Sequence, residues 1–148
     1  MFDRNGELFG SNQGSFEKNL YNEKTLEYKE TRQVCRPYPY PYGSILGTTA
    51  EEGDNVDCYI ITRESLKPGT IVGCEPIGLL EQDEDGEIDH KVLAVLPGQD
   101  IVIGEELLEE LRDFIQAVFA RYPDMVVRVG RLLPREAALD HIQARRDA

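Results

Sequence analysis

The stretch Glu51-Glu52-Gly53-Asp54-Asn55-Val56-Asp57 runs directly into the apolar residues Cys58-Tyr59-Ile60-Ile61. The same arrangement recurs downstream, where the acidic residues 81–89 precede Val92-Leu93-Ala94-Val95. The first cluster holds four carboxylates in seven residues, and the second holds six in nine. Short apolar runs bounded by turn residues are typical of buried strands. Each acidic cluster is therefore expected at the end of a strand that enters the core.

Concentrated negative charge suggests a cation site. Packing so many carboxylates together costs Coulomb energy unless cations lie among them. Mg²⁺ prefers carboxylate oxygens and water as ligands, and enzymes use it to hold phosphate groups. Mg²⁺-dependent phosphoryl chemistry is therefore the first hypothesis. Its plain alternatives are a solvated acidic loop and a simple hairpin turn. The residue order does not fit an EF-hand calcium loop.

The composition disfavours several classes of partner. A net charge of −12 argues against nucleic acid and anionic membranes, since both repel an acidic surface. No apolar run approaches the roughly 18–20 residues of a membrane span, and the polar residues 1–14 lack the apolar region of a signal peptide. The three cysteines, without CxxC spacing, are typical of reduced packing residues. We therefore expect a cytoplasmic protein.

A chain of 148 residues fits one folded domain. We expect a polar, loosely ordered segment at 1–17 and a single domain at 18–148. One or two exposed strands are expected within 20–34. Further strands, separated by turns at Lys67-Pro68-Gly69 and Asp85-Gly86, are expected at 57–62, 71–80 and 91–95.

The strongest helical pattern covers residues 105–122, where apolar residues recur at helical spacing and charged residues occupy the other face. Pro123 ends this helix. A short β-branched strand is expected at 125–129, and Pro134 opens a second amphipathic helix. Short strands followed by two helices indicate a mainly β fold, a small antiparallel barrel with both helices packed outside.

The segment Arg36-Pro37-Tyr38-Pro39-Tyr40-Pro41-Tyr42-Gly43 cannot form a helix. Alternate prolines fix the backbone angle φ, remove hydrogen-bond donors and force the preceding residues to be extended. We expect a stiff segment that displays its tyrosines. One interpretation of this segment is a ligand for partner domains that recognise proline-rich chains.

The order of these motifs resembles that of the soluble (family I) inorganic pyrophosphatases. In that family a Tyr-Gly pair, here Tyr42-Gly43, precedes an Asp-x-Asp-Pro-hydrophobic-Asp motif, here Glu52-Gly53-Asp54-Asn55-Val56-Asp57. A later loop of the form Asp-x-Gly-x-x-Asp-x-Lys corresponds to residues 84–91, and Phe119-Ala120-Arg121-Tyr122 resembles a helix that ends in a substrate tyrosine. The resemblance covers the chain from about Tyr38 to the C-terminus.

Several positions depart from the family pattern. Glu52 and Glu84 stand where the family usually has aspartate, Asn55 replaces a proline, and Pro123 replaces a lysine. The N-terminal third matches most loosely. Two cations there, Lys18 and Arg32, align with a phosphate-binding lysine and arginine, and Arg36 competes with Arg32 for that place.

The resemblance implies Mg²⁺-dependent hydrolysis of pyrophosphate to two phosphates, on a five-stranded barrel like the oligonucleotide/oligosaccharide-binding (OB) fold with two C-terminal helices outside. It gives Asp54 the role of general base. The implied metal ligands, for several Mg²⁺ ions or for Mn²⁺ or another divalent cation, are Glu52, Asp57, Glu84 and Asp89. The implied substrate-binding residues are Lys18, Arg32, Tyr42, Lys91 and Tyr122. It also implies a homo-oligomer, commonly a hexamer.

Two alternatives stay open at this point. The departures at Glu52, Glu84 and Pro123 are compatible with a catalytically weak relative that serves as a phosphate- or metal-binding module. The same site chemistry also suits a hydrolase of another polyphosphate.

Overall fold

The computed structural model describes residues 7–11, 17–21, 24–25, 27–33, 38–66, 70–99 and 101–147, and for 7–11, 17–21 and 30–33 it describes the backbone alone. The predicted turn at residues 67–69 lies outside these ranges, as does most of the N-terminal segment for which loose order was predicted. No helix in the described part of the chain has the length and apolar character needed to span a membrane.

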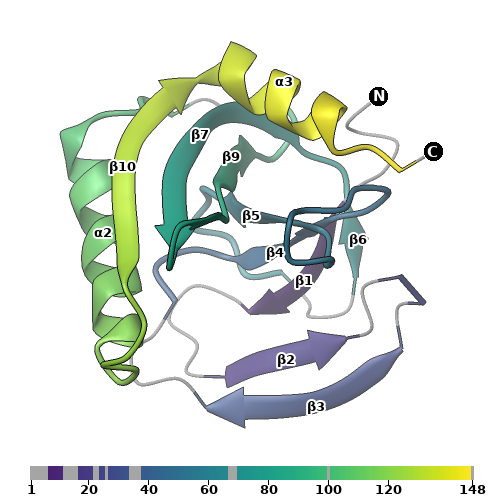
Figure 1. Cartoon of the computed structure of the whole chain (residues 1–148). Helices are drawn as coiled ribbons and strands as arrows, with labels where there is room; N and C mark the ends of the chain where they lie inside the picture. Colours follow the sequence, from purple (N-terminus) through teal and green to yellow (C-terminus); the bar gives the residue numbers. More distant parts are fainter. Residues whose placement is uncertain are drawn as a thin grey trace.

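Within these ranges, eight strands form one curved sheet in the order β10-β7-β9-β5-β4-β1-β6, with β8 paired to β7 (Figure 1). The pairing of β5 with β9 is parallel, and the other pairs in the sheet are antiparallel. The strands of this sheet are β1 (Glu7–Ser11), β4 (Tyr42–Ile45), β5 (Val56–Ile60), β6 (Ile71–Val72), β7 (Glu75–Glu84), β8 (Glu87–Ile88), β9 (Lys91–Val95) and β10 (Val127–Pro134). A separate hairpin consists of β2 (Glu17–Tyr21) and β3 (Tyr28–Gln33).

Alternation along the central strands divides the interior into two hydrophobic clusters. Tyr59 and Leu93 point into one cluster, whereas Cys58 and Val92 point into the other. Successive side chains of a strand face opposite sides of a sheet, so an uninterrupted apolar run fits a strand that is covered on both faces. This explains why β5 and β9 occupy the middle of the sheet, next to each other.

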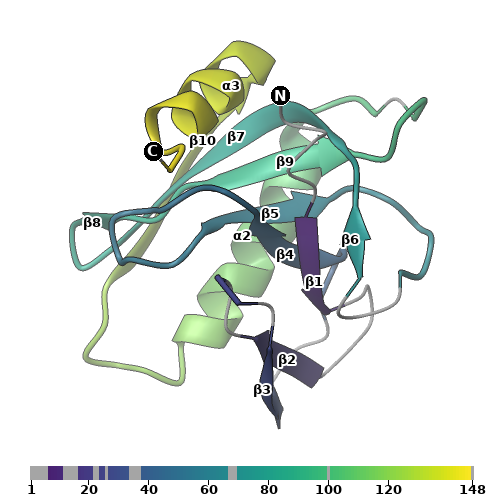
Figure 2. The same cartoon turned by 90° about the vertical axis from the view of Figure 1, so that its right-hand side faces the viewer.

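The two helices cover these clusters from different sides, as Figures 1 and 2 show. Helix α2 (Glu105–Phe119) buries Leu111 and Phe114 in the first cluster. Helix α3 (Arg135–Ala144) buries Ala138 and Ile142 in the second. The predicted helices are thus confirmed, although α2 ends at Phe119 and leaves Tyr122 on the following loop.

The second acidic cluster is not simply a loop. Strand β7 continues through polar residues as far as Glu84, because it pairs with β9 for part of its length and with β10 on its other side. Strand β10 is accordingly longer than the predicted strand at 125–129 and starts at Val127, opposite Glu84. The chain reverses at Asp85 and Gly86, as predicted, with φ of 54° and 86°.

The prediction that the Tyr-Pro segment displays its tyrosines is wrong for Tyr38 and Tyr40, which are each 5% exposed. Tyr38 packs on Tyr42 and Phe114, with ring centroids 5.4 and 4.9 Å apart. The Tyr40 hydroxyl donates a hydrogen bond to Glu110 on α2. Burial of these rings excludes them as ligands for partner domains in the folded protein.

Candidate active site

A buried lysine holds the site together. The Lys91 ammonium donates hydrogen bonds to Asp57 Oδ2 at 2.6 Å, to Asp89 Oδ2 at 2.9 Å and to the Tyr42 hydroxyl oxygen at 3.2 Å. Burial alone lowers the pKa of Lys91, but the two carboxylates more than reverse this and raise it well above its ordinary value. Lys91 therefore stays protonated, as a permanent positive charge between two carboxylates.

The strand pairing explains why these residues meet. Cys58 of β5 and Val92 of β9 are partners in a parallel pair. The preceding residues, Asp57 and Lys91, therefore lie at the same end of these two strands. On the other side of β5, Tyr42 pairs with Tyr59. Asp89 is two residues before Lys91, at the end of the acidic turn. Asp57 and Lys91 thus come from the starts of two parallel neighbours, whereas Tyr42 comes from the antiparallel strand β4 and contacts Lys91 through its hydroxyl oxygen.

Carboxylates from three segments converge beside this lysine. Glu52, Asp57 and Asp89 can each place one carboxylate oxygen so that all three oxygens lie within 4.8 Å of one another. Glu52 comes from a turn that depends on a glycine, because Gly53 has a φ of 98°. Three such oxygens match the ligand preference of Mg²⁺, Mn²⁺ and similar hard cations. The donor set therefore fits the predicted divalent cation.

Burial and neighbouring charges shift the pKa values of three of these carboxyl groups. Burial raises the pKa of Glu84 to about 8, and the hydrogen bond and charge of Asp89 contribute to the increase. Partial burial of the Glu52 carboxyl, with the charges of Asp89 and Asp57, raises its pKa to about 7. Burial also opposes ionisation of Asp89, but the neighbouring Lys91 charge holds the Asp89 pKa below its usual value.

Two cavities meet at these carboxylates. One, of about 340 Å³, is lined by Glu52, Glu84, Asp85, Glu87, Asp89 and Met125. The other, of about 190 Å³, has Lys91 and Tyr42 on its polar side and α2 residues such as Phe114 and Phe119 on its apolar side. Because Glu84 and Asp89 line both, the two cavities form adjoining parts of one candidate site.

The structure adds Gln82 to the predicted residues. Gln82 is 2% exposed, and its amide nitrogen donates to Glu84 Oε2 at 3.3 Å. Gln82 precedes Glu84 by two positions on β7, so both side chains lie on the same face of the strand. That spacing was visible in the sequence, but it carried no weight while the region was interpreted as a loop.

Of the remaining predicted residues, Asp54 and Tyr122 are exposed, and the side chains of Lys18 and Arg32 lie outside the description. Asp54 is exposed on the turn that carries Glu52. Tyr122 is 57% exposed on the loop after α2, with its ring centroid 6.4 Å from that of Phe119. Lys18 and Arg32 are backbone partners in the β2–β3 hairpin, but their side chains lie outside the description.

Removing the partly buried carboxylate charge of Glu84 is expected to stabilise the chelator-treated protein. A raised folded-state pKa means that ionisation opposes folding, so this cost is absent at about pH 4 and grows as the pH rises toward 8. Because Glu84 is only partly buried, we expect Glu84→Gln to raise the free energy of unfolding by about 1–2 kcal/mol at pH 8. Urea unfolding at both pH values measures this.

Asp83→Asn is the matched control for Glu84→Gln, because it changes the net charge equally from the neighbouring position on β7. We expect no comparable gain from it as the pH rises. If Glu84→Gln raised the free energy of unfolding equally at both pH values, the cost of ionising Glu84 would not be the cause.

Comparison with known proteins agrees with this geometry. The profile of the family described as inorganic pyrophosphatase matches residues 12–147. The chain belongs to this family. It is 34% identical over 135 residues to the inorganic pyrophosphatase of Nanoarchaeum equitans, and the alignment covers 84% of each chain. A shorter alignment, 37% identical over 94 residues, covers 60% of this chain and 53% of the inorganic pyrophosphatase of Aquifex pyrophilus.

A solved structure confirms the fold of this pyrophosphatase-family chain. The inorganic pyrophosphatase of Helicobacter pylori superposes with a TM-score of 0.85 at 19% identity, covering 98% of this chain and 94% of the other. The predicted fold class, an OB-like barrel with two helices outside, is therefore confirmed, with eight described strands in the sheet where five were expected. The family resemblance predicted from the Tyr-Gly pair and the two acidic motifs is confirmed as well.

Proposed function

We propose that this chain is an inorganic diphosphatase that hydrolyses pyrophosphate to two phosphates with several bound Mg²⁺ ions. The observation that carries the proposal is the convergence of Glu52, Asp57 and Asp89 oxygens within 4.8 Å of one another, beside the buried Lys91 ammonium. Membership of the pyrophosphatase family supports it independently. Mn²⁺ or another divalent cation is an alternative occupant, because the ligands are oxygens of the same kind.

The chain's carboxylates provide the ligands for these cations. We assign the role to Glu52, Asp57, Glu84 and Asp89. Divalent cations bound there would neutralise phosphate oxygens and lower the pKa of a water molecule. Lys91 holds two of the ligands in place through its hydrogen bonds to Asp57 and Asp89.

Asp54 is assigned the general base. It lies in the same turn as Glu52, two residues farther along the chain, where an exposed carboxylate can take a proton from an attacking water. Two backbone hydrogen bonds close this turn, from the Ala50 amide to the Asp54 carbonyl oxygen at 2.7 Å and from the Gly53 amide to the Ala50 carbonyl oxygen at 3.0 Å. Asp54 and Glu52 would thus act from one hydrogen-bonded turn, the first as a base and the second as a ligand.

Neutral and cationic donors are assigned to the phosphate groups. Burial, followed by the charge of Asp57, raises the pKa of Tyr42 well above its usual value, so its hydroxyl remains a neutral donor. Tyr122 is the second hydroxyl, and Lys91 is a cation on the same side as Tyr42. Lys18 and Arg32 complete the set. Their pairing in the β2–β3 register supports a joint role for them, because it brings two cations to one position of the hairpin.

Location and assembly complete the proposal. We assign the chain to the cytoplasm and to a homo-oligomer, a hexamer in the family pattern. Its net negative charge disfavours nucleic acid and anionic membranes as partners. Exposed apolar side chains such as Val102 and Leu139 are compatible with contacts between subunits. Sedimentation at micromolar concentration tests this, and a stable monomer would exclude it.

Phosphate release from Mg²⁺-pyrophosphate tests the activity. We expect release that depends on the divalent cation and is lost on chelation. No release above background with Mg²⁺ or Mn²⁺ across the neutral to alkaline range would reject the proposal. Calorimetric binding of metal and phosphate without turnover would instead favour the binding-module alternative. A higher specificity constant for another polyphosphate would change the substrate.

A further inference from the structure

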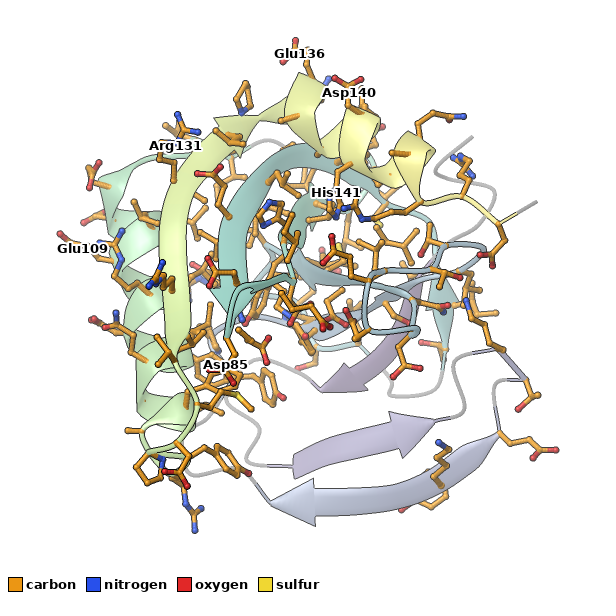
Figure 3. The ribbon with its side chains drawn as sticks, in the orientation of Figure 1. Asp85, Glu109, Arg131, Glu136, Asp140 and His141 are labelled. Atoms are coloured by element: carbon orange, nitrogen blue, oxygen red, sulfur yellow. The ribbon has the colours of Figure 1, made fainter. Side chains whose placement is uncertain are left out.

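Asp85 joins two segments at the rim of the candidate site. The ladder between β7 and β10 reaches the pair Glu84 and Val127, and Asp85 follows at the tip of the β7–β8 turn (Figure 3). The Asp85 amide donates to the Val126 carbonyl oxygen at 2.7 Å. In return, the Val126 amide donates to Asp85 Oδ1 at 2.8 Å. Two hydrogen bonds thus connect Asp85 to the residue that enters β10.

The second bond uses the side chain because the backbone has already turned. In a hydrogen-bonded antiparallel pair, each residue normally offers both its amide and its carbonyl group to the other. Asp85 has a φ of 54° and begins a two-residue turn with Gly86, so its backbone departs from the strand direction. Its carboxylate replaces the carbonyl as acceptor. Asp and Asn combine tolerance of positive φ with a short side-chain acceptor, which few other residues offer.

The segment held in this way leads from α2 to β10 and carries Tyr122. The Tyr122 carbonyl oxygen accepts a hydrogen bond from the Met125 amide at 2.9 Å, which closes a turn directly before Val126. Met125 lines the 340 Å³ cavity together with Glu52 and Asp89. A hydrogen bond at Val126 therefore acts on the position of Met125 at the cavity wall and of Tyr122 one turn away.

We propose that Asp85 is a positioning residue that holds the Tyr122–Val126 segment against the carboxylate cavity through its hydrogen bond to Val126. The link to catalysis through Tyr122 rests on the proposed function, whereas the effect on Met125 does not. A different role for Asp85 would be to attract a cation by its charge. The two roles differ in whether they require the acceptor oxygen or the negative charge.

Two substitutions separate these roles. Asp85→Asn keeps the acceptor oxygen and the tolerance of positive φ but removes the charge. Asp85→Gly keeps the turn and removes both the acceptor and the charge. Positioning by the hydrogen bond predicts that Asp85→Asn behaves as wild type and that Asp85→Gly does not. Attraction of a cation by charge predicts that both variants are altered.

Methionine-methyl NMR on the full chain measures the position of the segment without any need for activity. The sequence has two methionines, Met1 and Met125, so ¹³C-methyl labelling gives two signals, which Met125→Leu assigns. In chelator-treated protein we expect the Met125 signal to move or broaden in Asp85→Gly and to coincide with wild type in Asp85→Asn. An unchanged Met125 signal in Asp85→Gly, or equal changes in both variants, would overturn the proposal.

Kinetics with pyrophosphate test whether the effect reaches Tyr122. Loss of one hydrogen bond at this site is expected to raise KM in Asp85→Gly about fivefold. In a Tyr122→Phe background the same substitution should have little further effect, because residues that act together are not additive. Independent, additive effects would overturn the part of the proposal that involves Tyr122. Wild-type protein without pyrophosphate turnover would reject the proposed function, and the NMR result would still decide the role of Asp85.

Discussion

Replacing Asp89 with asparagine is expected to lower kcat for pyrophosphate hydrolysis by at least about 100-fold, a loss that a displacement of about 1 Å can already cause. Asp89 carries three roles at once in this site. It accepts a hydrogen bond from Lys91, contributes to the oxygen group with Glu52 and Asp57, and lines both cavities. Asparagine preserves its size but removes the charge that a divalent cation requires.

Steady-state phosphate release and Mg²⁺ titration measure this effect. Asp83→Asn is the control, since it removes the same charge from a strand position outside the three-oxygen group. We expect the control to retain activity, and circular dichroism should show both variants folded. Activity near the wild-type level in Asp89→Asn would place the reaction elsewhere in the molecule.

Replacing Lys91 with methionine is expected to lower the free energy of unfolding by about 3–5 kcal/mol in chelator-treated protein at neutral pH. The Lys91 side chain is 6% exposed, and those of its partners Asp57 and Asp89 are 18% and 16% exposed. Methionine preserves most of the hydrocarbon volume but leaves two partly buried carboxylates without their cation. Breaking a buried pair on one side is costly because the remaining charge is uncompensated.

The pH dependence of this loss has a definite sign. Lys91 helps to lower the pKa of Asp89, so it contributes stability that is present above the unfolded-state pKa of an aspartate, about 3.9, and is lost as the pH falls through the lower folded-state pKa. The difference between Lys91→Met and wild type should therefore shrink on acidification. Lys91→Arg, which keeps the charge, should lose less stability. If Lys91→Met lowered the free energy of unfolding by less than about 1 kcal/mol, as is typical of an exposed ion pair, Lys91 would not be the stabilising partner of the two carboxylates.

Much of the fold was predictable because its local signals are strong. The apolar residues 58–60 and 92–95 lie in the buried strands β5 and β9, as their composition predicts, and α2 follows the helical spacing of its leucines. The long strand β7 was predicted only in part. Its acidic end has the composition of a loop, and it is extended because β10 pairs with it, a contact between segments far apart in the sequence.

The candidate site was predictable to a similar extent. The resemblance to the pyrophosphatase motifs assigned Asp57, Asp89 and Lys91 to one site, and the structure brings them within hydrogen-bonding distance. Gln82 was not assigned a role, because its contact with Glu84 requires a strand where a loop was expected. Asp85 was predicted only as part of a turn, because its partner Val126 is far away in the sequence. The burial of Tyr38 was missed for the same reason, since it depends on the position of α2.

A crystal structure of the protein with Mn²⁺, located by its anomalous scattering, tests the central claim most directly. The account predicts ions bound by oxygens of Glu52, Asp57 and Asp89, with Glu84 as a further ligand and Lys91 still bonded to Asp57. It also predicts that Asp89→Asn loses at least one of these ions under the same conditions. Ions absent from this cluster at millimolar Mn²⁺, or bound only elsewhere on the acidic surface, would contradict it.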